Sequence, residues 1–247
     1  MDTDAAGDLG DAAGAELNRA YAGREFLEHM EEARNYADAI FAMLQSSAAG
    51  TRTILDFGGG SGSFARKFAE TGVTVDSVEA DEELRWRLAE VCGRAFADLG
   101  TVADAAYDFV YTINVLEHIA DDRAACRDIR RVLRPGGRVF VFVPAFPILW
   151  TSLDDAVEHE RRYAWSGLGR VLSDAGFEIE EIRYFDALGF PAALGVRLME
   201  SAGLFSYNRQ SIGFYDRYLF PVSRGADRIL GRAFGKNLVV RARRPAA

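Results

Sequence analysis

The segment of residues 54–64, ILDFGGGSGSF, constrains the fold of this chain more than any other segment. An apolar run ends at Asp56, a turn carries Gly58, Gly60 and Gly62, and a helical pattern follows. Glycine has no Cβ, so such a turn can bend sharply and bring its backbone close to a ligand. The first amides of the helix then face that ligand. The segment predicts a strand, a glycine loop and a helix whose start binds a ligand.

Strand-like and helix-like patterns alternate along most of the chain. Strands are predicted at residues 53–57, 73–78, 94–97, 109–113, 138–143, 177–185 and 237–243. Helices between them are predicted at residues 63–70, 82–91, 121–133 and 166–175. Repeated strand–helix units imply an α/β fold with a parallel sheet and helices on both faces. Ligands of such sheets bind beyond the carboxyl ends of the strands, where the glycine loop lies.

The remaining segments divide the chain further. Apolar residues recur every three to four positions from 16 to 45, which predicts one long amphipathic helix or two helices broken near Gly23. We expect five parts: a disordered tail (1–15), a helical cap (16–48), the α/β core (49–186), an insertion (187–235) and a last strand with a tail (236–247). The insertion interleaves aromatic residues with arginines. Three roles are compatible with this pattern: a substrate lid, a homodimer face or a membrane-surface contact.

Composition excludes several classes of protein. The chain has no signal-peptide pattern and no run of about 18 apolar residues, which argues against a membrane span. Its two cysteines, Cys92 and Cys126, lie apart in helical patterns and indicate a cytoplasmic protein without disulfides. A net charge of -8 argues against a nucleic-acid partner. Ten basic and three acidic residues follow position 196, either as a solvated region or as a surface for an anionic substrate or lipid.

Further motifs follow the glycine loop in a fixed order. Glu79 ends the second predicted strand, where a carboxylate can accept hydrogen bonds from both hydroxyls of a ribose. A solvated acid at a helix start is the alternative. Asp98-Leu99 ends the third strand, and residues 107–119 read YDFVYTINVLEHI before LRPGG at 133–137. This ordered set resembles small-molecule class I S-adenosylmethionine-dependent methyltransferases, with a core similar to bacterial ubiquinone and menaquinone methyltransferases.

The resemblance implies a fold, a cofactor and a reaction. The fold would be a Rossmann-like, seven-stranded, mostly parallel sheet with an N-terminal helical extension and an insertion before the last strand. The cofactor would be S-adenosyl-L-methionine, and an O, N or C nucleophile of a small molecule would take its methyl group by in-line displacement. The implied cofactor-binding residues are Asp56, Gly58, Gly60, Gly62, Glu79, Ala80, Asp98, Leu99 and Asn114.

A second segment, residues 154–163 (DDAVEHERRY), resembles a loop that bacterial small-molecule methyltransferases carry over the reactive centre. An imidazole titrates near neutrality, so His159 is the candidate general base, with Tyr163 as its helper or as a wall of the pocket. The alternative is that His159 only orders the loop against Asp155. Arg162 is a candidate for binding a substrate carboxylate or phosphate.

Glu117 and His118 are expected to frame the substrate pocket and not to bind a metal. Adjacent residues point in different directions, and no third ligand follows at helical spacing. Residues 114–117 read NVLE, unlike the N/D-P-P-Y/F motif of amino-methylating enzymes for adenine, so nucleic-acid methylation is not expected. Two alternatives stay open: an NAD(P)-dependent oxidoreductase, which would need a Tyr-x-x-x-Lys pair that this chain lacks, and a non-catalytic cofactor-binding protein.

Overall fold

A computed structural model describes residues 33–204 and 209–246 of the chain, and the following statements concern these residues. The expected tail at 1–15 and the helical pattern at 16–32 lie outside them. The seven strands are β1 (Ile54–Phe57), β2 (Val75–Val78), β3 (Ala95–Phe96), β4 (Tyr107–Ile113), β5 (Leu133–Pro144), β6 (Glu178–Phe185) and β7 (Asn237–Arg243).

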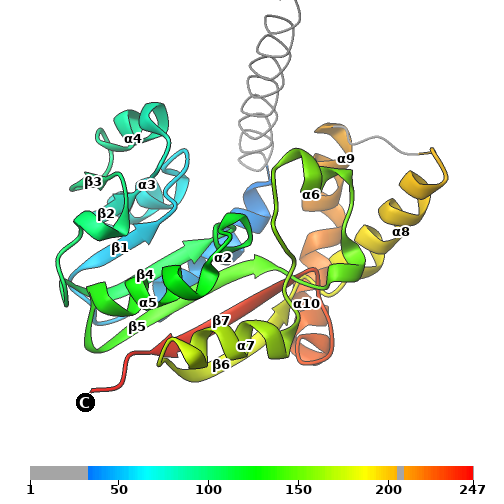
Figure 1. The fold of residues 1–247 in the computed structure, drawn as a ribbon. Coiled ribbons are helices and arrows are strands. Elements are labelled where there is room, and N and C mark those ends of the chain that lie inside the picture. Colours follow the sequence, from blue (N-terminus) through cyan, green and yellow to red (C-terminus); the bar gives the residue numbers. More distant parts are fainter. Residues whose placement is uncertain (1–32, 205–208, 247) are drawn as a thin grey trace, which may run out of the picture.

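The strands form one sheet in the order β3-β2-β1-β4-β5-β7-β6. β7 pairs antiparallel with β5 and β6, and the other pairings are parallel. The strand order reverses beside β1, because β2 and β4 lie on its two sides (Figure 1). The seven-stranded, mostly parallel α/β sheet expected from the sequence is therefore confirmed.

Helices connect the strands, and a group of helices precedes β7. The α-helices are α2 (Arg34–Ser47), α3 (Ser63–Glu70), α4 (Glu82–Leu88), α5 (Asp122–Val132), α6 (Ser152–Ala156), α7 (Trp165–Asp174), α8 (Gly189–Ser201), α9 (Arg209–Phe214) and α10 (Phe220–Leu230). Short turns of other helix types are η1 (Leu99–Thr101), η2 (Leu116–His118), η3 (Pro147–Leu149) and η4 (Tyr215–Leu219).

The sheet separates two apolar cores. Successive side chains of a strand point to opposite faces, so Val110 of β4 packs with α5 and α7 while Phe109 and Tyr111 pack with α2 and α3. In Figure 1, α5 and α7 lie in front of the sheet and α2 lies behind it. The central strands β4 and β5 are apolar on both faces because helices cover both.

One strand starts earlier than its sequence predicts. β5 begins at Leu133, directly after α5 and before the expected start at 138, and runs through the Pro-Gly-Gly segment at 135–137. The amide of Gly136 donates to the carbonyl of Arg244, and the amide of Arg244 donates to the carbonyl of Gly137. These backbone hydrogen bonds continue the ladder past the proline, which itself has no amide hydrogen to donate.

The helices between β6 and β7 contact the start of α2. The side chain of Asp216, in η4, accepts hydrogen bonds from the backbone amides of Asn35 (3.1 Å) and Tyr36 (2.9 Å). This carboxylate caps α2, since no side chain of its own segment does so. Within the described ranges, no helix has the length and apolarity that crossing a membrane requires.

Candidate active site

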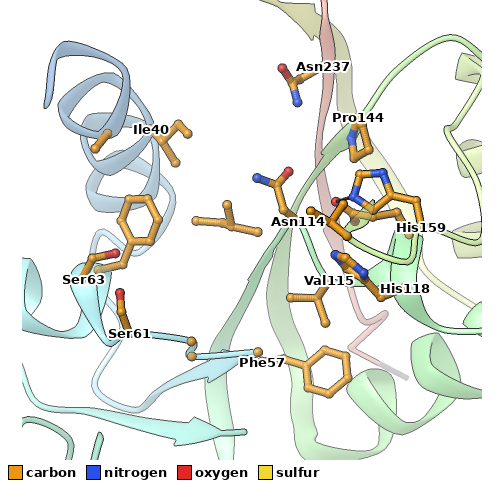
Figure 2. A pocket seen from close by; sticks show the side chains of 18 of the residues that line it. Ile40, Phe57, Ser61, Ser63, Asn114, Val115, His118, Pro144, His159 and Asn237 are labelled. Atoms are coloured by element: carbon orange, nitrogen blue, oxygen red, sulfur yellow. Dashed lines mark ion pairs between the residues drawn. The ribbon is translucent and has the colours of Figure 1, made fainter. Parts of the chain in front are cut away.

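A cavity of about 2110 Å³ lies beyond the carboxyl ends of β1, β2, β4 and β5. The glycine loop, α2, the loop after β5 and the helices before β7 all contribute to its wall. Figure 2 shows Ser61 and Ser63 on one side, His118 and His159 on the other, and Asn114 between them. The cavity therefore joins the two segments that the sequence analysis singled out.

The glycine loop enters the cavity at the end of β1. Gly58 has φ +86°, and a Cβ placed there would lie 2.2 Å from Cγ2 of Val115. A side chain at this position would therefore meet both backbone strain and a steric clash. Gly60 also lines the cavity, whereas Gly62 packs against Leu88 at the start of α3 and does not. Gly62 thus shapes the turn and not the cavity wall.

Glu79 holds the loop from the end of β2. Its Oε2 accepts a hydrogen bond from the amide of Gly60 at 2.8 Å, and its Oε1 accepts one from the amide of Asp81 at 2.9 Å. Its carboxylate and the neighbouring Ala80 line the cavity. A carboxylate there can accept hydrogen bonds from ligand hydroxyls.

Asp56 lies beneath the loop and is 3% exposed. Its Oδ2 accepts a hydrogen bond from the hydroxyl of Tyr111 at 2.9 Å. Burial raises the pKa of Asp56 to about 7; the Tyr111 hydrogen bond opposes this rise and the nearby Glu79 adds to it. The charge of Asp56 is therefore sensitive to what fills the cavity above it.

The structure brings three further predicted cofactor residues to the same cavity. Asp98 caps η1 by accepting from the amide of Thr101 at 3.1 Å, and Leu99 beside it is buried. Asn114 ends β4 with φ +53° and donates its amide to the carbonyl of Phe142. All three line the cavity.

On the opposite wall, His159 is held by Asp154. Nδ1 of His159 lies 2.7 Å from Oδ1 of Asp154. Arg162 donates two hydrogen bonds to the same carboxylate, from Nε to Oδ1 (2.7 Å) and from Nη2 to Oδ2 (2.9 Å). Burial alone would raise the pKa of Asp154, but the hydrogen bonds from His159 and Arg162 lower it to about 2. The carboxylate is ionised near neutral pH, so Nδ1 carries the proton and Nε2 is left free to accept one.

One expectation for this segment was wrong. The partner of His159 is Asp154 and not Asp155, whose carboxylate instead accepts from Nε1 of Trp150 at 2.9 Å. Asp154 turns inward because it belongs to a capping box with Thr151 at the start of α6. Arg162 pairs with Asp154 and also lines the cavity, so binding of a substrate carboxylate or phosphate by Arg162 stays a prediction.

Tyr163 does not line the cavity. Its hydroxyl lies 2.7 Å from Oδ2 of Asp122 and 3.1 Å from the carbonyl oxygen of Leu116, in the apolar core under the loop. Burial first, and then Asp122, raise the pKa of Tyr163 far above its ordinary value. Arg161 ties the loop down by donating to the carbonyls of Ile119 (2.8 Å) and Ala120 (2.9 Å). The expected catalytic helper is therefore a structural anchor.

Glu117 is 0% exposed and lines the cavity from η2. Among the described residues, neither of its carboxylate oxygens has a hydrogen-bond partner. Burial raises the pKa of Glu117 to about 8, although its own backbone amide and, less strongly, Arg162 oppose the rise. Nε2 of His159 lies 3.9 Å from its Oε1, and the rings of His118 and His159 meet edge to face at 4.7 Å.

A polar group that the sequence does not predict lies at the far end of the cavity. The hydroxyl of Tyr36 donates to Oδ1 of Asn237 at 2.7 Å, and Nζ of Lys236 lies 5.1 Å from the Tyr36 ring. Oδ2 of the buried Asp186 lies 3.8 Å from the same ammonium. No motif marks these residues, because they come from α2, β7 and the end of β6 and meet only in the fold.

The chain is similar to known methyltransferases. The model of the methyltransferase domain family matches residues 26–182. An uncharacterized methyltransferase of Mycobacterium avium (strain 104) is 39% identical over 169 residues, 62% of this chain and 65% of that protein. The O-methyltransferase resE of Aspergillus sclerotiorum is 37% identical over 108 residues, 39% of this chain and 40% of that protein. The chain thus spans less than two thirds of the length of these relatives.

A crystal structure of the [4+2]-cyclase SpnF superposes with a TM-score of 0.56 at 17% identity, covering 85% of this chain and 82% of that one. At this identity the likeness concerns the fold alone.

Proposed function

The chain belongs to the class I S-adenosylmethionine-dependent methyltransferases, and we propose that it transfers a methyl group to an O, N or C nucleophile of a small molecule. The observation that carries the proposal is the single cavity in which the glycine loop and Glu79 face His159 and Glu117. One wall has the groups to hold a cofactor, and the other has groups that can receive a proton.

The residues of the first wall fit S-adenosyl-L-methionine. The loop at Gly58 has φ +86° and leaves no space for a Cβ beside Val115, so this turn of the cavity wall needs glycine. We assign the ribose hydroxyls to Glu79, whose carboxylate lies at the end of β2. Asp98 and Leu99 would bind the adenine, and Asp56, Asn114 and the loop amides would surround the methionine part.

When bound, this cofactor supplies a methyl group that its sulfonium already activates. The protein therefore mainly positions the nucleophile and excludes water. His159 presents Nε2 to the cavity because Asp154 holds Nδ1, and it can accept the proton that an attacking hydroxyl loses. Glu117 and His118 lie beside it, where a polar group of the substrate would reach them.

Substrate choice is assigned to α2 and to the helices before β7, which line the cavity away from the glycine loop. Transfer to oxygen has support from the similarity to the O-methyltransferase resE. The exposed apolar side chains of Phe214, Tyr218 and Val222 would suit a dimer face or a contact with a membrane surface. The two free thiols, Cys92 and Cys126, accord with a cytoplasmic location.

Calorimetric titration with S-adenosyl-L-methionine and S-adenosylhomocysteine tests the cofactor assignment. We expect micromolar binding that Glu79→Ala weakens by about 10- to 100-fold, because charged hydrogen bonds are lost. Gly60→Val should weaken it severely, whereas Glu90→Ala, exposed and outside the cavity wall, should not. Unchanged affinity in both site variants would refute the assignment.

Incubation with labelled cofactor and a set of phenols, amines and acidic metabolites tests transfer itself. Methylation of at least one acceptor class is the expected result. Tight cofactor binding with no transfer to any acceptor would favour the non-catalytic alternative. Binding of NADH in place of S-adenosylmethionine would favour the oxidoreductase.

A further inference from the structure

We propose that Glu117, His118 and His159 form a binding site for one divalent transition-metal ion of the zinc or manganese type. This inference goes beyond the proposed methyl transfer and does not depend on it. It rests on the position of three side chains, on the unsatisfied carboxylate of Glu117 and on the residues behind His159.

The three residues already converge. One ligand atom from each lies within 4.8 Å of the others, and Nε2 of His159 is 3.9 Å from Oε1 of Glu117. Tetrahedral zinc, with bonds of about 2.0–2.2 Å, places its ligand atoms about 3.4 Å apart. Binding an ion would bring the His159–Glu117 pair about 0.5 Å closer, and a pair at the 4.8 Å limit about 1.4 Å closer, which side-chain rotations can supply. Figure 2 shows the rings of His118 and His159 next to each other at the cavity wall.

Glu117 supplies the independent reason to expect a cation. It is 0% exposed, and within the described part of the chain neither oxygen accepts a hydrogen bond. Burying a carboxylate without a donor or a counter-ion is costly, and native proteins rarely leave such a group unsatisfied. A metal ion between Glu117 and the two imidazoles would satisfy it.

The surroundings of His159 are those of a metal ligand. Asp154 holds Nδ1 at 2.7 Å, which fixes the tautomer and directs Nε2 toward Glu117. Asp154 is itself fixed by Arg162 and by the amide of Thr151 at 2.8 Å. Carboxylates commonly orient metal-bound histidines in this way.

The kind of ligand indicates the kind of ion. Two imidazole nitrogens and one carboxylate suit zinc, manganese or ferrous iron, whereas magnesium and calcium prefer oxygen ligands. Three protein ligands leave coordination positions free, and all three residues line the cavity. A substrate oxygen could occupy such a position.

From the sequence we expected that Glu117 and His118 bind no metal, because no third ligand follows them at helical spacing. The fold supplies one from the loop after β5, and the amide of Glu160 ties that loop to the carbonyl of Glu117 at 2.7 Å. The ion and a proton would compete for Nε2 of His159. A metal-bound form would activate a substrate oxygen directly, and a metal-free form would use the imidazole as base.

Metal content and affinity test this inference without any assay of methyl transfer. Tag-free protein is dialysed against zinc or manganese and then against metal-free buffer, and bound metal is measured by mass spectrometry. Titration calorimetry then gives the affinities for Zn²⁺, Mn²⁺ and Mg²⁺. We expect one equivalent of Zn²⁺ or Mn²⁺ per chain and much weaker binding of Mg²⁺.

Glu117→Gln and His159→Asn should abolish this binding, and Asp154→Asn should weaken it by about 10- to 100-fold. Glu160→Gln, which neutralises an exposed neighbouring acid, should leave it unchanged. If Glu117→Gln does not fold, His118→Asn at an exposed position replaces it. The inference would be overturned if the protein binds no stoichiometric metal, or if the Glu117 and His159 variants bind the metal as tightly as the unchanged protein does. Neither result would bear on the binding of S-adenosylmethionine.

Discussion

Oδ1 of Asp154 lies 2.7 Å from Nδ1 of His159, and this contact decides which imidazole nitrogen faces the cavity. The neighbouring acid, Asp155, points away toward Trp150. The two consecutive carboxylates therefore form a matched pair for experiment, because only one of them can orient the imidazole.

Asp154→Asn should lower kcat without changing cofactor affinity, since it frees the tautomer and the orientation of His159. The loss should fall within the range of about 100- to 10,000-fold that general acid–base groups contribute. Steady-state kinetics with the acceptor found by screening, together with cofactor titration, measure both quantities. Asp155→Asn is the control and should retain kcat. If Asp154→Asn and Asp155→Asn have the same kcat, Asp154 does not act in the mechanism.

Gly58→Ala should destabilise the protein more than Gly72→Ala. Both glycines have positive φ, which costs an alanine about 1–2 kcal/mol. The Cβ at 58 would also clash with Val115, and such overpacking adds about 1–3 kcal/mol, whereas position 72 has open space. Urea unfolding measures the difference in the free energy of unfolding. Adding Val115→Ala to Gly58→Ala should recover part of the excess; no recovery would show that the clash is not its cause.

The stability of the cofactor-free protein should fall as pH rises from about 4 to 7, through Asp56. The fold raises the pKa of Asp56 from its ordinary 3.8 to about 7, mainly because of burial. The folded state therefore keeps a proton that the unfolded state has lost, and ionisation in this window favours unfolding.

Protonated Asp56 makes its full contribution to the free energy of unfolding below about pH 4. This contribution is lost by about pH 7, at no more than about 1.4 kcal/mol per pH unit. Urea unfolding at several pH values measures the slope. Asp56→Asn should flatten it, and Glu79 and Cys92, which also interact with Asp56, stay unchanged in the comparison. An identical slope in the variant would contradict the raised pKa.

Asp216→Ala should destabilise the protein by about 0.5–2 kcal/mol, as expected for loss of a helix cap. Its carboxylate accepts from two amides at the start of α2. Asp38→Ala, also on α2, removes an exposed ion pair with Lys67 of α3 and should cost about 0–1 kcal/mol. Thermal and urea unfolding compare the two variants, and equal losses would mean that Asp216 does not act as a cap.

Much of the core could be predicted from the sequence because its signals are local. Buried strands read as short apolar runs, and a loop such as 58–62 needs glycine at fixed positions. β1, α3 and β7 begin and end within one residue of the expected bounds. β5 was less predictable, because the hydrogen bonds that extend it come from Arg244, far along the chain.

The site was predictable where residues follow strand ends and was not where they lie on loops. Glu79 and Asn114 reach the cavity because the carboxyl ends of neighbouring strands meet there. Asp154 and Asp155 cannot be told apart by type or spacing, because a capping box with Thr151 sets their directions. The same limit applies to Tyr163, which lies between α6 and α7, because its partner Asp122 lies on α5.

The cap that Asp216 places on α2 joins two segments of the cavity wall that lie far apart in the sequence. Both segments line the cavity, and each depends on the other although 180 positions separate Tyr36 from Asp216. Transplanting the helices before β7 into a related scaffold would leave α2 uncapped unless the donor's α2 came with them. The part of the chain to which we assign substrate choice is therefore discontinuous, and recombination with a single breakpoint would separate its two halves.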